Sequence, residues 1–441
     1  EPWFGREHSD LWAASPELEA PTAGDLLRKV AEFDGPVRAW SMDAKGRLAM
    51  VGFLNPEAFN SYDRPSLLFA EGEWPMKARD IGAGCDFDFG ESLASDQHPP
   101  RGGGQIPLAI DADGRSVVTV LGRRGAANLV RVGVESGKVE DVLGGGLEVL
   151  HATATRDASI WALTRGDAST PLELWTLEVA KGPARRLHAP NQALFDERAK
   201  AGIEEIWFDS FDGRKIHGWI VRPPAFDAAK KYPLILEIHG GPHAAYGQSF
   251  YHEFHALAGA GYVVLYTNPR GSTTYGHEFG NMIQYRYPGD DYEDLMAGVD
   301  AVIQRGSIDE SRIGVTGGSG GGLLTNWVIT KTRRFKAAVT QRCVADWASM
   351  YYSSDFAMFT PFWFRKAPFE DLKEYSERSP VTYASAIETR YAETGKWKKF
   401  RRDAVDATAA AGKVLALVER GLADATGPNA KAFVVGRQFA D

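Results

Sequence analysis

The feature that most restricts the fold of this chain is a glycine-rich pentapeptide between an apolar strand pattern and a helical pattern. Ile313 to Thr316 form the apolar run, Gly317-Gly318-Ser319-Gly320-Gly321 follows, and the helical residues Leu323 to Ile329 come next. Flanking glycines permit a sharp strand-to-helix turn, and such a turn exposes the serine hydroxyl. The pattern therefore predicts that Ser319 is a nucleophile, while a purely structural glycine turn stays open as the alternative.

The residues around this turn alternate between buried strands and helices. Near-continuous apolar runs at 232–238, 262–266 and 336–340 are typical of parallel strands covered on both faces. The segment 291–305 repeats apolar residues at helical spacing, and 208–216 has the pattern of a hairpin. Alternation of β and α over this length predicts a doubly wound α/β sheet.

The first half of the chain has a different pattern. From about residue 36 to 190, short alternating runs are separated by turn residues, with little helical periodicity. The order strand, Asp-x-x-Gly turn, strand occurs at 43–47 and 111–115, and in a looser form at 155–158. A repeat of roughly 40–70 residues with four strands per unit is typical of β-propeller blades. We expect a partial all-β propeller of about three blades, with a plain β-sandwich as the alternative.

A length of 441 residues is enough for two or three domains with separate cores. We expect a partial β-propeller over residues 1–195 and an α/β-hydrolase domain over residues 196–389. Residues 390–441 have a different, Ala-rich composition and are expected to form a divergent helical tail.

Charge and hydropathy exclude two classes of partner. The net charge is -8, from 50 basic and 58 acidic residues, so no overall positive field attracts nucleic acid or anionic lipid. The longest apolar stretches, such as 261–266, are far shorter than the roughly 18–20 residues that a membrane-spanning helix needs. We expect no nucleic-acid partner and no membrane partner.

The two cysteines, Cys85 and Cys343, are far apart and have no metal-ligand spacing, so neither a disulfide framework nor a zinc site is predicted. Low cysteine use mildly favours a reducing compartment, hence a cytoplasmic protein. Export stays open because the chain begins at Glu1 without an initiator Met. No phosphate loop or dinucleotide fingerprint is present, and no cofactor and no metal are expected.

A second glycine motif, His239-Gly240-Gly241-Pro242, follows the predicted strand at 232–238. Acyl transfer needs two N–H donors directed at the oxyanion. In this type of fold, one donor is the residue after the nucleophile and the other comes from an H-G-G loop. The candidate donors are therefore the N–H groups of Gly320 and Gly241, although these glycines could also be simple turn residues.

Together these motifs resemble the catalytic domain of the prolyl oligopeptidase family of serine peptidases, with the acylaminoacyl peptidases as the most similar branch. The similarity covers about residues 200–389. It is carried by His239-Gly240-Gly241-Pro242, Asn268-Pro269-Arg270-Gly271-Ser272, Tyr275-Gly276, Asp291-Tyr292-Glu293-Asp294, the turn at Ser319, and Ser379-Pro380.

The resemblance implies hydrolysis of short peptides, with removal of N-acylated residues, by a Ser-His-Asp mechanism without a cofactor. It also implies a propeller that restricts access to the site, and homo-oligomers are common in the family. Family members normally have seven blades, so the sequence is expected to lack part of the propeller. The residue after the serine is often aromatic in the family, and Gly320 keeps the backbone donor but loses that packing.

The catalytic base is the main departure from the family pattern. In α/β-hydrolases the histidine follows the serine, but all ten histidines of this chain precede Ser319. His239 and His243 are weak substitutes because they belong to the oxyanion loop. The acids after Ser319 include Asp346, Asp355 and Asp403, which are better explained as solvated residues or helix caps.

Three functions therefore remain open. The first is a serine peptidase of the acylaminoacyl type, whose turnover in this chain is impaired by the absent base. The second is a general esterase on the same fold, which would leave the propeller and the segment 268–275 unexplained. The third is a non-catalytic scaffold that binds peptides, which the absent histidine favours.

Overall fold

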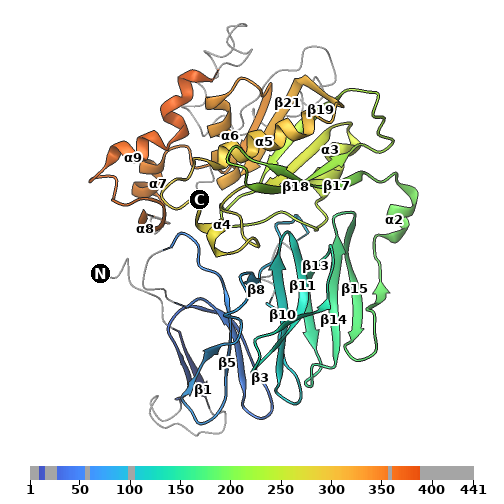
Figure 1. Ribbon diagram of the computed structural model, residues 1–441, viewed down its shortest axis with the longest axis vertical. Helices are drawn as coiled ribbons and strands as arrows, with labels where there is room; N and C mark the ends of the chain where they lie inside the picture. Colours follow the sequence, from blue (N-terminus) through green and yellow to red (C-terminus); the bar gives the residue numbers. More distant parts are fainter. Residues whose placement is uncertain (1–8, 15–26, 55–59, 98–104, 356–359, 388–441) are drawn as a thin grey trace. The chain divides into compact units, whose positions relative to one another are not determined.

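The computed structural model describes residues 9–14, 27–54, 60–97, 105–355 and 360–387 (Figure 1). The chain divides into two compact units. Unit 1 comprises Glu1–Arg198, Gly247–Tyr251 and Thr273–Asn281, and unit 2 comprises Ala199–Tyr246, His252–Ser272 and Met282–Asp441. The predicted tail at 390–441 lies outside the described residues.

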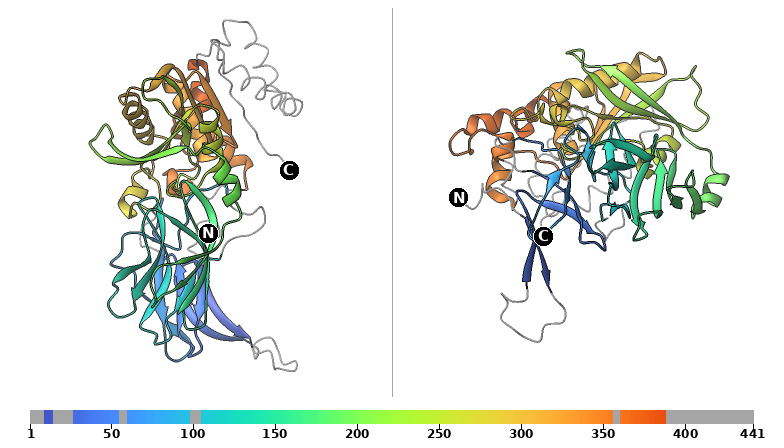
Figure 2. Two further views of the ribbon diagram at one scale, coloured as in Figure 1. Left: turned by 90° about the vertical axis from the view of Figure 1, so that its right-hand side faces the viewer. Right: turned by 60° about the horizontal axis from the view of Figure 1, so that its bottom comes forward.

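Unit 1 is built mainly from antiparallel strands. Three meanders of four strands follow one another along the chain, and β1 with β2 forms a further antiparallel pair, visible as the dark-blue ribbon in Figure 2. The first meander is β3 (Val37–Met42), β4 (Leu48–Gly52), β5 (Ser66–Ala70) and β7 (Arg79–Asp80); the second is β9 (Leu108–Ile110), β10 (Ser116–Arg123), β11 (Ala126–Gly133) and β12 (Val139–Leu143); the third is β13 (Glu148–Ala154), β14 (Ile160–Asp167), β15 (Thr170–Glu178) and β16 (Arg185–His188). The remaining elements are β1 (Ser9–Ala14), β2 (Leu27–Phe33), β6 (Met76–Lys77), β8 (Asp88–Phe89), α2 (Gln192–Glu197) and α4 (His277–Asn281).

Each meander begins with one of the three strand–turn–strand repeats seen in the sequence. The three turns share one backbone hydrogen bond. In each, the fourth residue donates its N–H to the carbonyl of the first residue, at 2.8–3.1 Å. This donor has a left-handed backbone in all three, with φ of 77° at Gly46, 77° at Gly114 and 54° at Ala158. Glycine adopts this conformation without strain, so the looser third repeat has a strained alanine at the equivalent position.

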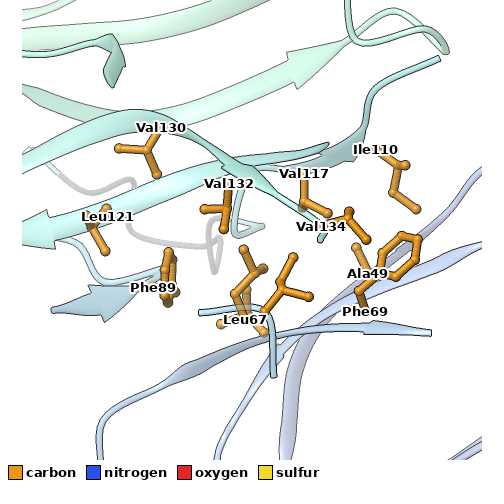
Figure 3. Packing of buried hydrophobic residues seen from close by; sticks show 12 residues of the cluster. Ala49, Leu67, Phe69, Phe89, Ile110, Val117, Leu121, Val130, Val132 and Val134 are labelled. Atoms are coloured by element: carbon orange, nitrogen blue, oxygen red, sulfur yellow. The ribbon is translucent and has the colours of Figure 1, made fainter. Parts of the chain in front are cut away.

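The strands β4 and β5 are buried on both faces. Ala49, Val51, Leu67 and Phe69 face a core that they share with β10 and β11, and Figure 3 shows the side chains of this core. The alternate residues of the same two strands enter a second core with β1, β2 and β6. Because strand side chains alternate between faces, these strands form a central layer between two apolar cores.

Two segments from the second half of the sequence are bound within unit 1 by buried carboxylates. Glu148 accepts hydrogen bonds from the Ser249 hydroxyl and, at 3.3 Å, from the Leu93 N–H. Asp88 accepts the N–H of Thr274 and the hydroxyl of Tyr62. Burial raises the pKa of Glu148 to about 7 and that of Asp88 to about 6.

Unit 2 contains a six-stranded sheet in the order β17-β18-β20-β19-β21-β22. The strands β17 and β18 form the predicted hairpin, β18 is antiparallel to β20, and the remaining neighbours are parallel. The strands are β17 (Gly202–Asp209), β18 (Lys215–Arg222), β19 (Tyr232–Ile238), β20 (Val263–Asn268), β21 (Ile308–Gly318) and β22 (Ala337–Gln341). The helices are α3 (His252–Gly259), α5 (Asp291–Ile303), α6 (Gly320–Lys331), α7 (Trp347–Ser353), α8 (Thr360–Trp363), α9 (Leu372–Glu377) and the 3₁₀ helix η2 (Pro380–Ala386).

Helices cover both faces of this sheet. Phe254 of α3 stacks on Tyr266 of β20, with ring centroids 4.7 Å apart. Gly298 of α5 lies against Thr267, the next residue of the same strand, whose side chain points to the opposite face. The predicted α/β class with a doubly wound sheet is therefore confirmed.

Candidate functional site

Ser319 lies at the carboxyl end of β21, between the strand and helix α6. Its backbone is left-handed, with φ 58° and ψ -118°, and its side chain is exposed. The N–H of Ser319 donates to Gln341 O at 2.8 Å, and its carbonyl accepts the N–H of Leu323 at 2.9 Å. A left-handed non-glycine residue costs about 1–2 kcal/mol, so these two bonds hold Ser319 in a strained turn that presents its hydroxyl.

The glycines around Ser319 are required by close backbone contacts. A Cβ atom on Gly317 would lie 2.6 Å from Ile238 O, and one on Gly321 would lie 2.0 Å from the same oxygen. A Cβ atom on Gly322 would lie 2.6 Å from Gln341 O. Helix α6 therefore begins in contact with the ends of β19 and β22, which no larger residue would permit.

The loop that carries Gly240 and Gly241 lies against this turn. A Cβ atom on Gly240 would be 3.4 Å from Ser319 Cβ, and one on Gly320 would be 2.6 Å from Gly241 O. Gly241 has a φ of 112° that favours glycine. Among the described residues, neither the Gly241 N–H nor the Gly320 N–H has a hydrogen-bond acceptor. The two predicted oxyanion donors thus lie beside Ser319, Gly241 on the loop that follows β19 and Gly320 as the first residue of α6.

Tyr287 occupies the space beside Gly320. Its hydroxyl donates to Gly320 O at 3.1 Å and would lie 2.8 Å from a Cβ atom at that position. The side chain is buried, and burial raises the pKa of Tyr287 well above its ordinary value, so the phenol remains a donor. The sequence predicted that a glycine at 320 would lose packing, but the Tyr287 side chain fills this space.

The described histidines do not supply a base to Ser319. His239 Nε2 lies 2.9 Å from Ser272 Oγ and its Nδ1 lies 2.7 Å from Gly240 O, while burial lowers its pKa to about 4. His243 Nδ1 lies 2.9 Å from Gly271 O. Among the described residues, no side chain hydrogen-bonds the Ser319 hydroxyl. Both histidines instead connect the loop that follows β19 to the loop that follows β20.

The acids considered from the sequence have other surroundings. Asp346 is the N-cap of α7 and accepts the N–H groups of Ala348 and Ser349, as the helix-cap explanation predicted. Asp355 is exposed, and Asp403 lies outside the described residues. Neither Asp346 nor Asp355 therefore completes a triad.

Two of the family-like motifs form a buried ion pair that fixes the loop after β20. The guanidinium of Arg270 makes two 2.8 Å bonds to the carboxylate of Asp294, which also accepts the Arg270 N–H and the Ser210 hydroxyl. Asp291, in the same motif, accepts the N–H of Gly289, and burial raises its pKa to about 7. Asp294 therefore holds the loop after β20 in place, and Asp291 holds the turn that precedes helix α5.

Sequence reasoning missed two residues near Ser319. Tyr287 has no local pattern, because its contact with Gly320 arises only from the folded chain. Arg342 follows the predicted strand at 336–340, and residues at the carboxyl ends of parallel strands tend to line binding sites. That signal could have identified Arg342.

The described residues include neither a candidate membrane-spanning helix nor a candidate metal site. No described helix combines the length and apolar character that crossing a membrane requires. In the described part of the chain, there is no cluster of three or more His, Cys, Asp or Glu side chains that could hold a metal ion.

Comparison with known proteins shows what the second half of the chain is similar to. Residues 248–394 match the model of the prolyl oligopeptidase family. The uncharacterized peptidase YuxL of Bacillus subtilis is 44% identical over 221 residues, which cover 50% of this chain and 34% of that protein. Dipeptidyl-peptidase 5 of Schizosaccharomyces pombe is 33% identical over 187 residues, which cover 41% of this chain and 27% of that protein.

A solved structure, the acylaminoacyl peptidase of Pyrococcus horikoshii, is similar with a TM-score of 0.66 and 25% identity. The match covers 81% of this chain and 53% of that structure. The chain thus spans about a third of the length of the two curated relatives and about half of the solved structure. The predicted resemblance to the prolyl oligopeptidase family is confirmed over residues 248–394, which match the model of that family.

Proposed function

We propose that unit 2 carries the acyl-transfer site of a serine peptidase that acts on short peptides. Ser319 is the nucleophile, and the N–H groups of Gly241 and Gly320 bind the oxygen of the attacked carbonyl as it becomes negative. The observation that carries this proposal is the strained, exposed Ser319 in direct contact with a loop that has an N–H group without an acceptor among the described residues.

We propose further that acylation by these 441 residues is slow. Attack requires that the Ser319 proton passes to a base, and both candidate imidazoles contact other groups. Every histidine of this sequence precedes Ser319, so these residues include no imidazole in the usual order. Loss of the base in such triads lowers turnover by several powers of ten while binding persists.

The substrate class follows from the names of the relatives, which include an acylaminoacyl peptidase and dipeptidyl peptidases. We propose short peptides with either a blocked or a free N-terminus as substrates. Comparison of an N-acetyl-aminoacyl anilide, a dipeptidyl anilide and a nitrophenyl ester would separate the two peptidase types from a general esterase.

The nucleophile is tested by labelling with a small fluorophosphonate, with Ser319→Ala as the control. We expect slow labelling that maps to Ser319 and is absent from the variant. Failure of Ser319 to react at high probe concentration would contradict its role as nucleophile. Labelling as fast as in a peptidase with a complete triad would contradict the absence of a working base.

A non-catalytic peptide-binding scaffold is the second candidate. It is favoured by the Ser319 hydroxyl, which has no hydrogen-bond partner among the described residues. Calorimetry distinguishes the two functions: peptide binding without product formation and without Ser319 labelling would support the scaffold.

A further inference from the structure

Ser319 and Arg342 occupy equivalent positions at the ends of neighbouring parallel strands. The register pairs Gly318 of β21 with Gln341 of β22, so the next residues along the two strands are Ser319 and Arg342. Both leave the sheet with a left-handed backbone, at φ 58° and φ 49°. Since the Ser319 N–H donates to Gln341 O, the two strand ends are joined directly at this point.

The Arg342 guanidinium lies beside the residue that precedes the nucleophile. A Cβ atom on Gly318 would lie 2.9 Å from Arg342 Nη2, and the glycine leaves the space that the guanidinium occupies. Consecutive Cα atoms are about 3.8 Å apart, so this cation lies within about two residues' length of the Ser319 hydroxyl.

Arg342 differs from the two buried arginines of this unit. Arg270 is bonded to Asp294, and Arg378 donates to the carbonyls of Tyr287 and Trp363. The Arg342 side chain is exposed, and no described residue forms a hydrogen bond or ion pair with it. A strained backbone that carries an unpaired cation beside a nucleophile indicates that its partner is a ligand.

We propose that Arg342 binds a carboxylate of the peptide substrate within about two residues of the scissile bond. This inference rests on the proposed function and adds a substrate class, short acidic peptides. A guanidinium matches a carboxylate with two parallel N–H donors, which a neutral amide does not satisfy. The carboxylate has two sources, the free C-terminus of the peptide or an Asp or Glu side chain.

Binding to the full chain with Ser319→Ala tests this without turnover. Calorimetry compares N-acetyl-trialanine as free acid and as amide, and N-acetyl-Ala-Asp-Ala-amide with its Asn counterpart. We expect one acid to bind at least about tenfold more tightly than its neutral partner, because charge-assisted hydrogen bonds are strong. The pair that shows the preference identifies the source of the carboxylate.

Two substitutions connect the preference to Arg342. Arg342→Gln should remove the preference for the acid, and Arg342→Lys should retain part of it. Arg312→Gln should leave the preference unchanged, because Arg312 lies on β21 several residues before Ser319. No preference in either pair, or a preference that survives Arg342→Gln, overturns the proposal. Thermal unfolding checks that each variant is folded.

Labelling separates this inference from the proposed function. A neutral fluorophosphonate should label Ser319 equally in the native chain and in Arg342→Gln. Labelled Ser319 without an acid preference would contradict only the role of Arg342. An Arg342-dependent preference without labelling would support the role of Arg342 and contradict the nucleophile.

Discussion

At residue scale, two oxygen atoms leave no room for a side chain at position 320. Gly241 O and Tyr287 Oη lie 2.6 and 2.8 Å from the place where a side chain would begin. One oxygen belongs to the loop that follows β19, and the other to a buried phenol that donates to Gly320 O. A larger residue would therefore displace both the loop and the N–H group that follows Ser319.

We predict that Gly320→Ala lowers the rate of fluorophosphonate labelling of Ser319 at least tenfold. The added methyl group overpacks the site, which typically costs about 1–3 kcal/mol of unfolding free energy. Gly259→Ala is the control, because a Cβ atom there meets nothing within 4 Å. Equal labelling rates in Gly320→Ala and the native chain would show that the loop adapts without cost.

At element scale, the three repeated turns of unit 1 differ at one residue. Gly46 and Gly114 adopt left-handed backbones without strain, whereas Ala158 adopts one with a Cβ atom. Nothing lies within 4 Å of a Cβ atom on Gly46, so this position isolates the backbone cost from packing.

We predict that Ala158→Gly raises the unfolding free energy by about 0.5–1 kcal/mol, because relief of left-handed strain exceeds the added entropy of the unfolded chain. Gly46→Ala, the opposite change at the equivalent position of the first turn, should lower the unfolding free energy by about 1 kcal/mol. Urea unfolding measures both. A loss of stability in Ala158→Gly would mean that the buried methyl contributes more than the backbone strain costs.

We predict that Asp294→Asn lowers the unfolding free energy by about 2–4 kcal/mol, because Arg270 would lose its only fully buried carboxylate partner among the described residues and keep only the more exposed Asp212 and Asp290. Asp300→Asn, on the same helix α5, is the control. Its partner Arg334 is more exposed, so we expect a change of about 1 kcal/mol or less. Similar losses of unfolding free energy in Asp294→Asn and Asp300→Asn would show that the buried ion pair contributes no more than the exposed one.

The elements differ in how far the sequence predicts them. A near-continuous apolar run located β19 closely, and apolar residues at helical spacing located α5. Strands such as β6, β7 and β8 have two residues each and form only by pairing with distant strands, so no local pattern marks them.

The residues of the candidate site also differ in how far the sequence predicts them. Ser319, Gly241 and Gly320 belong to motifs whose spacing is local, and their proximity follows from parallel strands that end at one edge. Tyr287 reaches Gly320 across 33 positions of sequence, a contact that only the folded chain creates.

At the scale of the whole molecule, buried carboxylates make stability depend on pH. Glu148 has an ordinary pKa of 4.5 and a pKa of about 7 in the folded chain, because burial disfavours the charged form. Between these values the folded chain holds a proton that the unfolded chain has released. The unfolding free energy therefore falls as pH rises through this window.

We predict that Glu148→Gln becomes increasingly stable relative to the native chain between pH 5 and pH 8, by roughly 2–3 kcal/mol in total. The amide can still accept the Leu93 N–H and carries no charge to bury. Glu140→Gln, at an exposed position of unit 1, should show no such trend. Parallel pH profiles for Glu148→Gln and the native chain would contradict a titration of Glu148 in this window.

Unit 1 is assembled from three separate segments of the sequence, and this has a consequence for recombination between related genes. Gly247–Tyr251 and Thr273–Asn281 are encoded well after Arg198, yet they belong to the first unit and provide the donors Ser249 and Thr274. A recombination event near codon 198 would join acceptors from one parent to donors from another. Exchange of the first 198 residues as a cassette is therefore disfavoured, and this unit should be inherited together with the sequence that follows it.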